Sequence, residues 1–212
     1  MMGKFITFEG GEGTGKTTQI ERAKAYLASK NIEAVVTREP GGTYGAEAIR
    51  DLLLKGTHER WNGMTELLLL YAARLDHVEK FIKPALNRGV WVLCDRFADS
   101  SMAYQGYARG LGPERVKTLH ETVLGNFQPD MTIVLDLDPI LAHKRVETRG
   151  EELTRFDTES LEFHKVIRDA FLDIAKHNPK RVKVVDAAHS REAIAAQIRE
   201  LLASQIEAIN CG

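Results

Sequence analysis

Short apolar runs alternate with longer amphipathic stretches along this chain of 212 residues. The short runs are bounded by turn residues and predict strands, whereas the longer stretches repeat apolar residues at the spacing of one helix face. Their alternation predicts an α/β fold with parallel strands, organised as a single domain over residues 1–212. The predicted strands are 4–9, 32–37, 90–95, 131–137 and 181–186, and the predicted helices are 16–29, 45–55, 63–87, 113–124, 139–149, 157–177 and 190–209.

Net charge, the length of apolar runs and the cysteine count argue against several classes of protein. A net charge of −1 gives no bulk basic field for nucleic acid or for an anionic membrane, and no apolar run approaches the length of a membrane span. The two cysteines, Cys94 and Cys211, have no C-x-x-C partner, which argues against a disulfide framework or a zinc site. Lys4 leads directly into the first strand without room for a signal peptide, so we expect a reducing, cytoplasmic location.

The first strand runs into a glycine-rich segment, residues 10–17, with the spacing G-x-x-x-x-G-K-T. This is the P-loop pattern, in which successive backbone N–H groups surround a phosphate at the start of a helix. Lys16 can bridge the β- and γ-phosphates of a nucleotide, and the Thr17 hydroxyl can ligate Mg²⁺. A chance glycine turn would lack the strand before it and the helix after it. The predicted ATP-binding residues are Gly10, Gly11, Glu12, Gly13, Thr14, Gly15, Lys16, Thr17 and Thr18.

Two later strands end in aspartate after an apolar run, Asp95 and Asp136, and either carboxylate fits a magnesium-binding role beside the P-loop. Arg96 follows the first of them. A guanidinium there can hold an acceptor phosphate through two hydrogen bonds, or it can pair with a neighbouring carboxylate.

Other polar segments fall where a parallel sheet binds its ligands. The segment 38–43 follows the second strand and is either a surface turn or part of the cleft. Arg74 lies beside the apolar stripe of helix 63–87, as a ligand contact or as an extended surface side chain. Residues 97–110 are rich in Ser, Gly and Tyr and suit a small-molecule pocket, with Tyr104 as a flat wall and Gln105 reading amide-like edges.

Three arginines, Arg145, Arg149 and Arg155, cluster around Gly150. They either complement the C-terminal end of a helix or belong to a mobile lid, at about residues 145–157, that neutralises a transferring phosphoryl group. The seven histidines do not form a convincing metal-ligand set.

Six segments in this order closely resemble the bacterial thymidylate kinases over nearly the whole chain. They are 8–19, 38–43, 71–74, 95–97, 100–106 and 149–150 with Arg155. The resemblance implies a five-stranded parallel sheet flanked by helices, with an ATP site, an acceptor site and a short lid. It also implies transfer of the γ-phosphoryl group of ATP to dTMP with Mg²⁺, giving dTDP, and a homodimer.

The resemblance also implies roles at the acceptor site. Arg96 would clamp the dTMP phosphate, and Glu12 would accept a hydrogen bond from the sugar 3′-OH. Tyr104 would pack near the sugar 2′ position and disfavour ribonucleotides. Arg74 and Gln105 would read the thymine edge. The remaining members of the implied acceptor site are Glu39, Pro40, Leu70 and Ser100.

The family supplies its catalytic arginine in two ways, and this sequence also has one departure from the family pattern. The P-loop interior contains no arginine, so the sequence is similar to the type that supplies its catalytic arginine from the lid, with Arg149 first and Arg145 and Arg155 in support. Leu70 stands where many relatives stack a phenylalanine on the base. A leucine covers the base without an aromatic face, which leaves relaxed selectivity toward dUMP as the alternative function.

A different class of function, a P-loop switch that hydrolyses nucleotide and signals to partners, needs no acceptor pocket. GTPases of that class usually carry an N-K-x-D segment, and this sequence has none.

Overall fold

The computed structural model of the chain describes residues 2–56, 60–147 and 154–210. Its strands form a five-stranded parallel sheet in the order β2-β3-β1-β4-β5, which confirms the predicted fold class. The strands are β1 (Phe5–Glu9), β2 (Ala34–Arg38), β3 (Trp91–Asp95), β4 (Met131–Asp136) and β5 (Val182–Asp186). Since β1 lies between β3 and β4, the loop that leaves β1 opens at the crevice where α/β sheets bind ligands.

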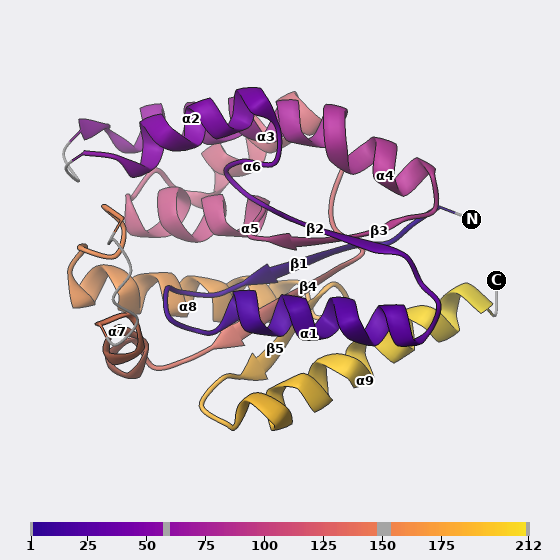
Figure 1. Cartoon of the computed structure of the whole chain (residues 1–212). Coiled ribbons are helices and arrows are strands. Elements are labelled where there is room, and N and C mark those ends of the chain that lie inside the picture. The colour runs from indigo at the N-terminus through magenta and orange to yellow at the C-terminus, as the bar shows by residue number, and fades with distance from the viewer. Residues whose placement is uncertain (1, 57–59, 148–153, 211–212) are drawn as a thin grey trace.

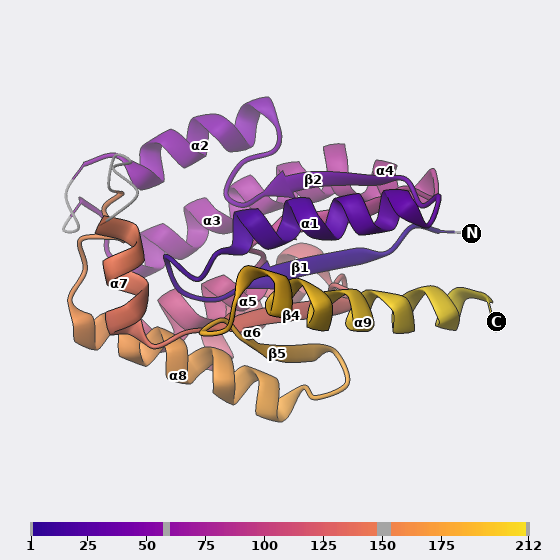
Figure 2. The same ribbon diagram turned by 60° about the horizontal axis from the view of Figure 1, so that its bottom comes forward.

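Helices cover both faces of this sheet (Figure 1). They are α1 (Lys16–Ser29), α2 (Tyr44–Leu54), α3 (Gly63–His77), α4 (Lys83–Asn87), α5 (Ala98–Ser101), α6 (Pro113–Leu124), α7 (Pro139–Glu147), α8 (Leu161–His177) and α9 (Arg191–Asn210), with π-helical segments η2 (Val78–Ile82) and η3 (Met102–Ala108). Helices α1 and α9 lie side by side on one face, as Figure 2 shows. Helices α3, α4, α6 and α8 cover the other face.

The core follows from the alternation of side chains along each strand. Ile6 and Phe8 of β1 pack into the cluster beneath α1 and α9, whereas Phe5 packs into the cluster beneath α3 and α6. All three are buried, so β1 contributes apolar side chains to both faces of the sheet. This explains why the strand reads as a continuous apolar run in the sequence.

Two helix boundaries differ from the predicted ones. The stretch predicted as one helix, 63–87, is interrupted by η2. Pro84 has no N–H for the carbonyl one turn before it, and the wider π-helical turn accommodates that loss. The helix predicted from 157 begins at Leu161, because the side chain of Ser160 accepts the N–H of Phe163 and caps the helix there.

Residues 97–110 were predicted only as a polar pocket segment, and most of them are helical, in α5 and η3. The helical conformation is not evident from their composition, because Ser, Gly and Tyr do not favour a helix strongly. Packing decides the conformation: Ala103, Tyr104, Gln105 and Gly106 are buried together, and η3 lies against α6 and α8.

None of the helices in the described part of the chain has the length and apolar character needed to cross a membrane.

Candidate active site

The P-loop joins the end of β1 to the start of α1. Two of its glycines are required by close approach: a Cβ on Gly10 would lie 2.5 Å from the carbonyl oxygen of Leu135, and one on Gly13 would lie 2.3 Å from that of Ala142. Both also have positive φ angles, 129° and 72°. The loop is thus pressed against β4 and α7, and the N-terminus of α1 faces the cleft, where it favours an anion.

Lys16 is buried at the first position of α1. Its Nζ donates to the carbonyl oxygens of Gly11 at 2.8 Å and Gly10 at 3.3 Å, so the amine lies over the loop that would hold phosphate. Burial and the nearby Arg96 lower the pKa of Lys16 to about 8, against the opposing effect of Asp95, Glu12 and Glu9. The amine remains mainly charged at neutral pH, as phosphate binding requires.

The structure separates the two aspartates that the sequence left open. Asp136 forms a two-point ion pair with Arg168, at 2.7 and 2.9 Å, and is thereby satisfied. Asp95 faces the P-loop with a buried Oδ1 that has no hydrogen-bond partner among the described residues. An unsatisfied buried carboxylate oxygen is suited to a metal ion or its water, so Asp95 fits the magnesium-binding role.

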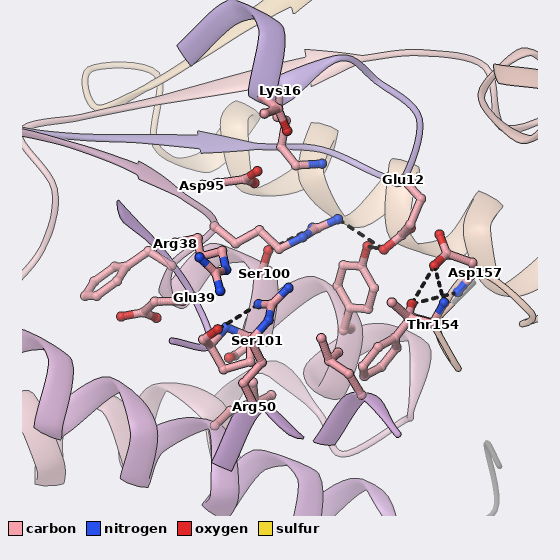
Figure 3. Close-up of a pocket in the computed structure, with 18 of the residues that line it drawn as sticks. Glu12, Lys16, Arg38, Glu39, Arg50, Asp95, Ser100, Ser101, Thr154 and Asp157 are labelled. Atoms are coloured by element: carbon pink, nitrogen blue, oxygen red, sulfur yellow. Dashed lines mark hydrogen bonds and ion pairs between the residues drawn. The ribbon is translucent and has the colours of Figure 1, made fainter. Parts of the chain in front are cut away.

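A cavity of about 250 Å³ opens between the P-loop and the ends of β2 and β3 (Figure 3). Lys16 and Asp95 lie together on one side of it, and Thr154 and Asp157 lie on another. The volume is several times the roughly 30 Å³ that one water occupies, so the cavity takes a small molecule. The sequence-predicted residues that line it are Glu12, Gly13, Gly15, Lys16, Thr17, Glu39, Pro40, Leu70, Arg74, Asp95, Arg96, Ser100, Tyr104 and Gln105.

Three other predicted ATP-binding residues, Gly10, Gly11 and Thr14, line a smaller neighbouring cavity between the P-loop, α7 and α8. Thr18 is partly buried in α1 and lines neither of these two cavities.

Glu12 is the centre of the polar contacts in the main cavity. Its Oε1 accepts hydrogen bonds from Tyr104 Oη at 2.6 Å and from Arg96 Nη2 at 3.1 Å. Burial favours the neutral acid, but Arg96, His164, Lys16 and Tyr104 together lower the pKa of Glu12 to about 2. The carboxylate is therefore ionised at neutral pH and can accept a further hydrogen bond, for example from a sugar hydroxyl.

Arg96 forms the ion pair with a neighbouring carboxylate that the sequence allowed, and its side chain also borders the cavity. It pairs with Glu12, and it also donates to Gly10 O at 2.9 Å and Ser100 Oγ at 3.2 Å while lining the cavity. Its φ of 70° is in the left-handed region, an uncommon conformation for a residue with a side chain. Strain of this kind persists where the surroundings over-determine the backbone, which is common at binding sites.

Glu9 was not among the predicted site residues. Its carboxylate binds the residues that directly follow Arg96. It is fully buried and accepts hydrogen bonds from Phe97 N at 2.8 Å and from Ser100 Oγ at 2.5 Å. Burial and the nearby Asp99 raise the pKa of Glu9 to about 7. In the sequence Glu9 only ends the apolar run before the P-loop, and nothing there indicates that its side chain binds the segment after Arg96.

Arg74 is only 2% exposed, so the interpretation as an extended surface side chain is wrong. Its Nε donates to Glu39 Oε2 at 2.6 Å, and its Nη2 donates to Phe97 O and Ser101 Oγ, both at 3.0 Å. Segment 38–43 is likewise part of the cleft, because Glu39 and Pro40 line the cavity.

Gln105 lines the cavity and donates from Nε2 to Glu66 Oε2 at 3.0 Å. Its Oε1 is buried without a hydrogen-bond partner in the described ranges, as a ligand-reading amide would be. Arg155 meets the same glutamate: its Nη2 lies 3.2 Å from Glu66 Oε1, and its Nε donates to Leu53 O at 2.5 Å.

The two lid arginines that the structure describes, Arg145 and Arg155, have different partners. Arg155 is buried beside Glu66 and does not line the main cavity, which corrects the expectation that it neutralises the transferring group. Arg145 donates to the carbonyl of Ala187 at 3.2 Å, on the β5–α9 connection, and does not line the cavity either. Arg149, the first choice, lies outside the described residues.

Two arginines of the cavity were missed as individual contacts. Arg38 ends β2 and lies in strand register with Asp95. Arg50 projects from α2 and donates to Pro40 O at 2.7 Å, while burial and Arg38 lower its pKa. Arg38 belongs to segment 38–43, which the sequence already indicated as a possible part of the cleft. Nothing in the pattern of the predicted helix 45–55 indicated that Arg50 contacts the cavity. Two cations beside Arg96 give this side of the cavity an affinity for phosphate.

No group of three or more His, Cys, Asp or Glu side chains placed to hold a metal ion occurs among the residues that the structure describes.

Comparison with known proteins gives a consistent result. A family model described as thymidylate kinase matches residues 8–198. The chain is 49% identical to a thymidylate kinase of a Marinomonas species over 208 residues, 98% of each chain. It is 46% identical to that of Caulobacter vibrioides, over 96% of this chain and 98% of the relative. The crystal structure of thymidylate kinase from Ehrlichia chaffeensis matches with a TM-score of 0.76 and 36% identity, over 95% of this chain and 99% of that one. The chain belongs to the thymidylate kinase family.

Proposed function

We propose that this protein transfers the γ-phosphoryl group of ATP to dTMP, giving dTDP and ADP. The family assignment supports this activity and does not favour the dUMP alternative. One observation carries the proposal: a single cavity connects the P-loop with the buried Arg74 and Gln105. A phosphate donor and an acceptor base thus find their contacts in the same enclosed space. We propose that the whole chain acts as one kinase domain with a lid at about residues 145–157.

The nucleotide side of the site rests on the P-loop. Its backbone N–H groups and the N-terminus of α1 surround the donor phosphates. Lys16 exchanges its carbonyl contacts with Gly10 and Gly11 for phosphate oxygens. Thr17 and Asp95 would hold Mg²⁺, and the unsatisfied Oδ1 of Asp95 fits that role. When bound, the metal would supply positive charge against the donor phosphates.

The acceptor side separates phosphate, sugar and base. Arg96, aided by Arg38 and Arg50, holds the dTMP phosphate, whose oxygen attacks the γ-phosphorus as the bond to the leaving ADP oxygen breaks. Glu12 accepts the sugar 3′-OH, and Tyr104, fixed by its hydrogen bond to Glu12, closes the space around the sugar. These contacts align two anionic reactants, which is the main catalytic requirement of the reaction.

Base recognition falls to Arg74 and Gln105, with Leu70 covering the base by apolar contact. Each of the two polar residues has one buried atom without a hydrogen-bond partner among the described residues, Arg74 Nη1 and Gln105 Oε1. A donor and an acceptor on residues that line the same cavity match the carbonyl and N–H of a thymine edge. Glu39, Pro40 and Ser100 complete the acceptor site.

We further propose a homodimer in the cytoplasm, with no nucleic-acid or membrane partner. Met64, Leu68 and Leu75 of α3 are exposed and fall on one face of the helix. An exposed apolar row of this kind supports association with a second copy.

The proposed activity is tested by measuring ADP release with ATP and Mg²⁺ while dTMP, dUMP, UMP, CMP, AMP and GMP are offered in turn. We expect strong preference for dTMP and little turnover of ribonucleotides. Equal turnover of dUMP would mean that Leu70 leaves the base pocket relaxed. ADP release that does not depend on any acceptor would contradict the kinase proposal.

Arg149→Ala is expected to lower kcat by about a thousandfold, the scale for an arginine that meets a transferring phosphoryl group, while KM for dTMP changes little. Arg115→Ala, on the exposed side of α6, is the matched control and should keep full activity. A change confined to the dTMP KM would instead assign Arg149 to the acceptor site.

A further inference from the structure

A chain of buried hydrogen bonds runs behind the base end of the cavity, from the end of β2 to α3. Thr37 Oγ1 lies 2.7 Å from Nε2 of His77, whose Nδ1 lies 3.0 Å from Oε1 of Glu39. The other carboxylate oxygen of Glu39 accepts from Arg74 Nε at 2.6 Å. His77 is fully buried and does not line the cavity, so it has no direct contact with a bound ligand.

Both ring nitrogens of His77 are occupied by these contacts. A carboxylate accepts hydrogen bonds, so Nδ1 of His77 donates to Oε1 of Glu39, while Nε2 shares a hydrogen bond with the Thr37 hydroxyl. The ring stacks on Phe81 at 5.7 Å. A Cβ on Gly42 would lie 2.4 Å from Nε2 of His77, so the backbone closes directly over the ring. His77 therefore holds one orientation and occupies one oxygen of Glu39.

Arg74 depends on that carboxylate for its own orientation. Nε is bound by Glu39 and Nη2 by Phe97 O and Ser101 Oγ, and the guanidinium lies over the rings of Tyr71 and Phe97. Only Nη1 is buried without a hydrogen-bond partner in the described part of the chain. An arginine donates and never accepts, so a fixed Nη1 favours a base with a carbonyl oxygen at that edge over one with an amino group.

We propose that His77 is a positioning residue for base selection. By holding Oε1 of Glu39, it keeps the carboxylate turned so that Oε2 meets Arg74 Nε and Nη1 is presented to the acceptor base. This proposal rests on the proposed function, since it takes the base end of the cavity as the thymine site. Without His77, Oε1 of Glu39 loses its hydrogen bond and the carboxylate is free to turn, so the guanidinium of Arg74 loses its single orientation.

The test compares two substitutions. His77→Phe keeps the ring and its stacking but removes both hydrogen bonds, whereas His77→Asn keeps a donor near the place of Nδ1. For His77→Phe we expect kcat/KM for dTMP to fall about tenfold, as for loss of a buried hydrogen bond to a charged group, and mostly through KM for dTMP. KM for ATP should not change, and His77→Asn should recover most of the loss.

Selectivity separates positioning from a general structural role. The dTMP-over-dCMP ratio of kcat/KM should fall in His77→Phe, because cytosine carries an amino group where thymine carries a carbonyl oxygen. Thr37→Val should give a smaller fall of the same kind. His177→Phe, on the exposed side of α8, is the control and should behave as the unsubstituted protein.

Several results would overturn the proposal. They are an equal loss of dTMP and dCMP turnover, a rise in the ATP KM, or a His77→Asn variant no better than His77→Phe. If dCMP turnover is below detection in every variant, the KM for dTMP of His77→Asn is the test. Recovery supports the proposal, and no recovery contradicts it. Thermal unfolding of each variant identifies any loss that comes from unfolding. A failure of the proposed function is distinct, because the unsubstituted protein would then not phosphorylate dTMP.

Discussion

Replacing Lys16 by alanine is expected to lower kcat/KM for phosphoryl transfer by about a hundred- to a thousandfold, the scale of removing one preorganised contact to transition-state charge. Lys16 is the P-loop cation that lies over the carbonyls of Gly10 and Gly11. Among the described residues no other lysine lines the main cavity, so no second lysine replaces its charge there. Steady-state ADP release with ATP and dTMP measures the effect.

The fold should survive this substitution, because Lys16 stands at the end of α1 and alanine favours a helix. Lys24→Ala, on the exposed side of the same helix, is the matched control and should keep full turnover. Near-normal activity of Lys16→Ala, with an unchanged thermal midpoint, would remove the P-loop assignment.

Arg96→Ala is expected to reduce kcat/KM for dTMP by a similar factor, about a hundred- to a thousandfold. The guanidinium is the cation placed between the P-loop carbonyl of Gly10 and Ser100, where the proposed acceptor phosphate meets the donor. Arg96→Lys keeps the charge but loses the two-point geometry, so it should recover only part of the activity. ATP affinity should change far less than dTMP affinity.

The same substitution has a consequence for pH. Arg96 opposes the effect of burial on Glu12, and its removal leaves burial to raise the pKa of Glu12 above its present value of about 2. Glu12 then loses its charge as the pH falls through that higher pKa, so residual activity of Arg96→Ala should decline at a higher pH than that of the unsubstituted protein. Arg199→Ala, exposed on α9, is the control. An unshifted acid limb would mean that Arg96 does not set the charge of Glu12.

Local sequence patterns predicted the P-loop because all its requirements lie within one short segment. The strand, the glycines and the following lysine are neighbours in the chain, so their spacing alone defines the geometry. Helix boundaries depended on single residues, and the prediction missed those at Pro84 and Ser160 for that reason. The helical conformation of residues 98–108 was not predicted, because burial against α6 and α8 outweighs their weak helix propensity.

Three features follow from sequence patterns alone: the order of strands and helices along the chain, the position of the phosphate loop, and the strand ends that carry several of the cavity residues. Periodicity reports which residues share a face of one element, and strand ends converge at one edge of a parallel sheet. Which side chains meet across elements follows from the packed structure alone. It placed Arg155 beside Glu66 and joined Glu39 to both Arg74 and His77. Such pairs are tens of residues apart in the chain, and packing between elements, which spacing does not encode, brings them within hydrogen-bond distance.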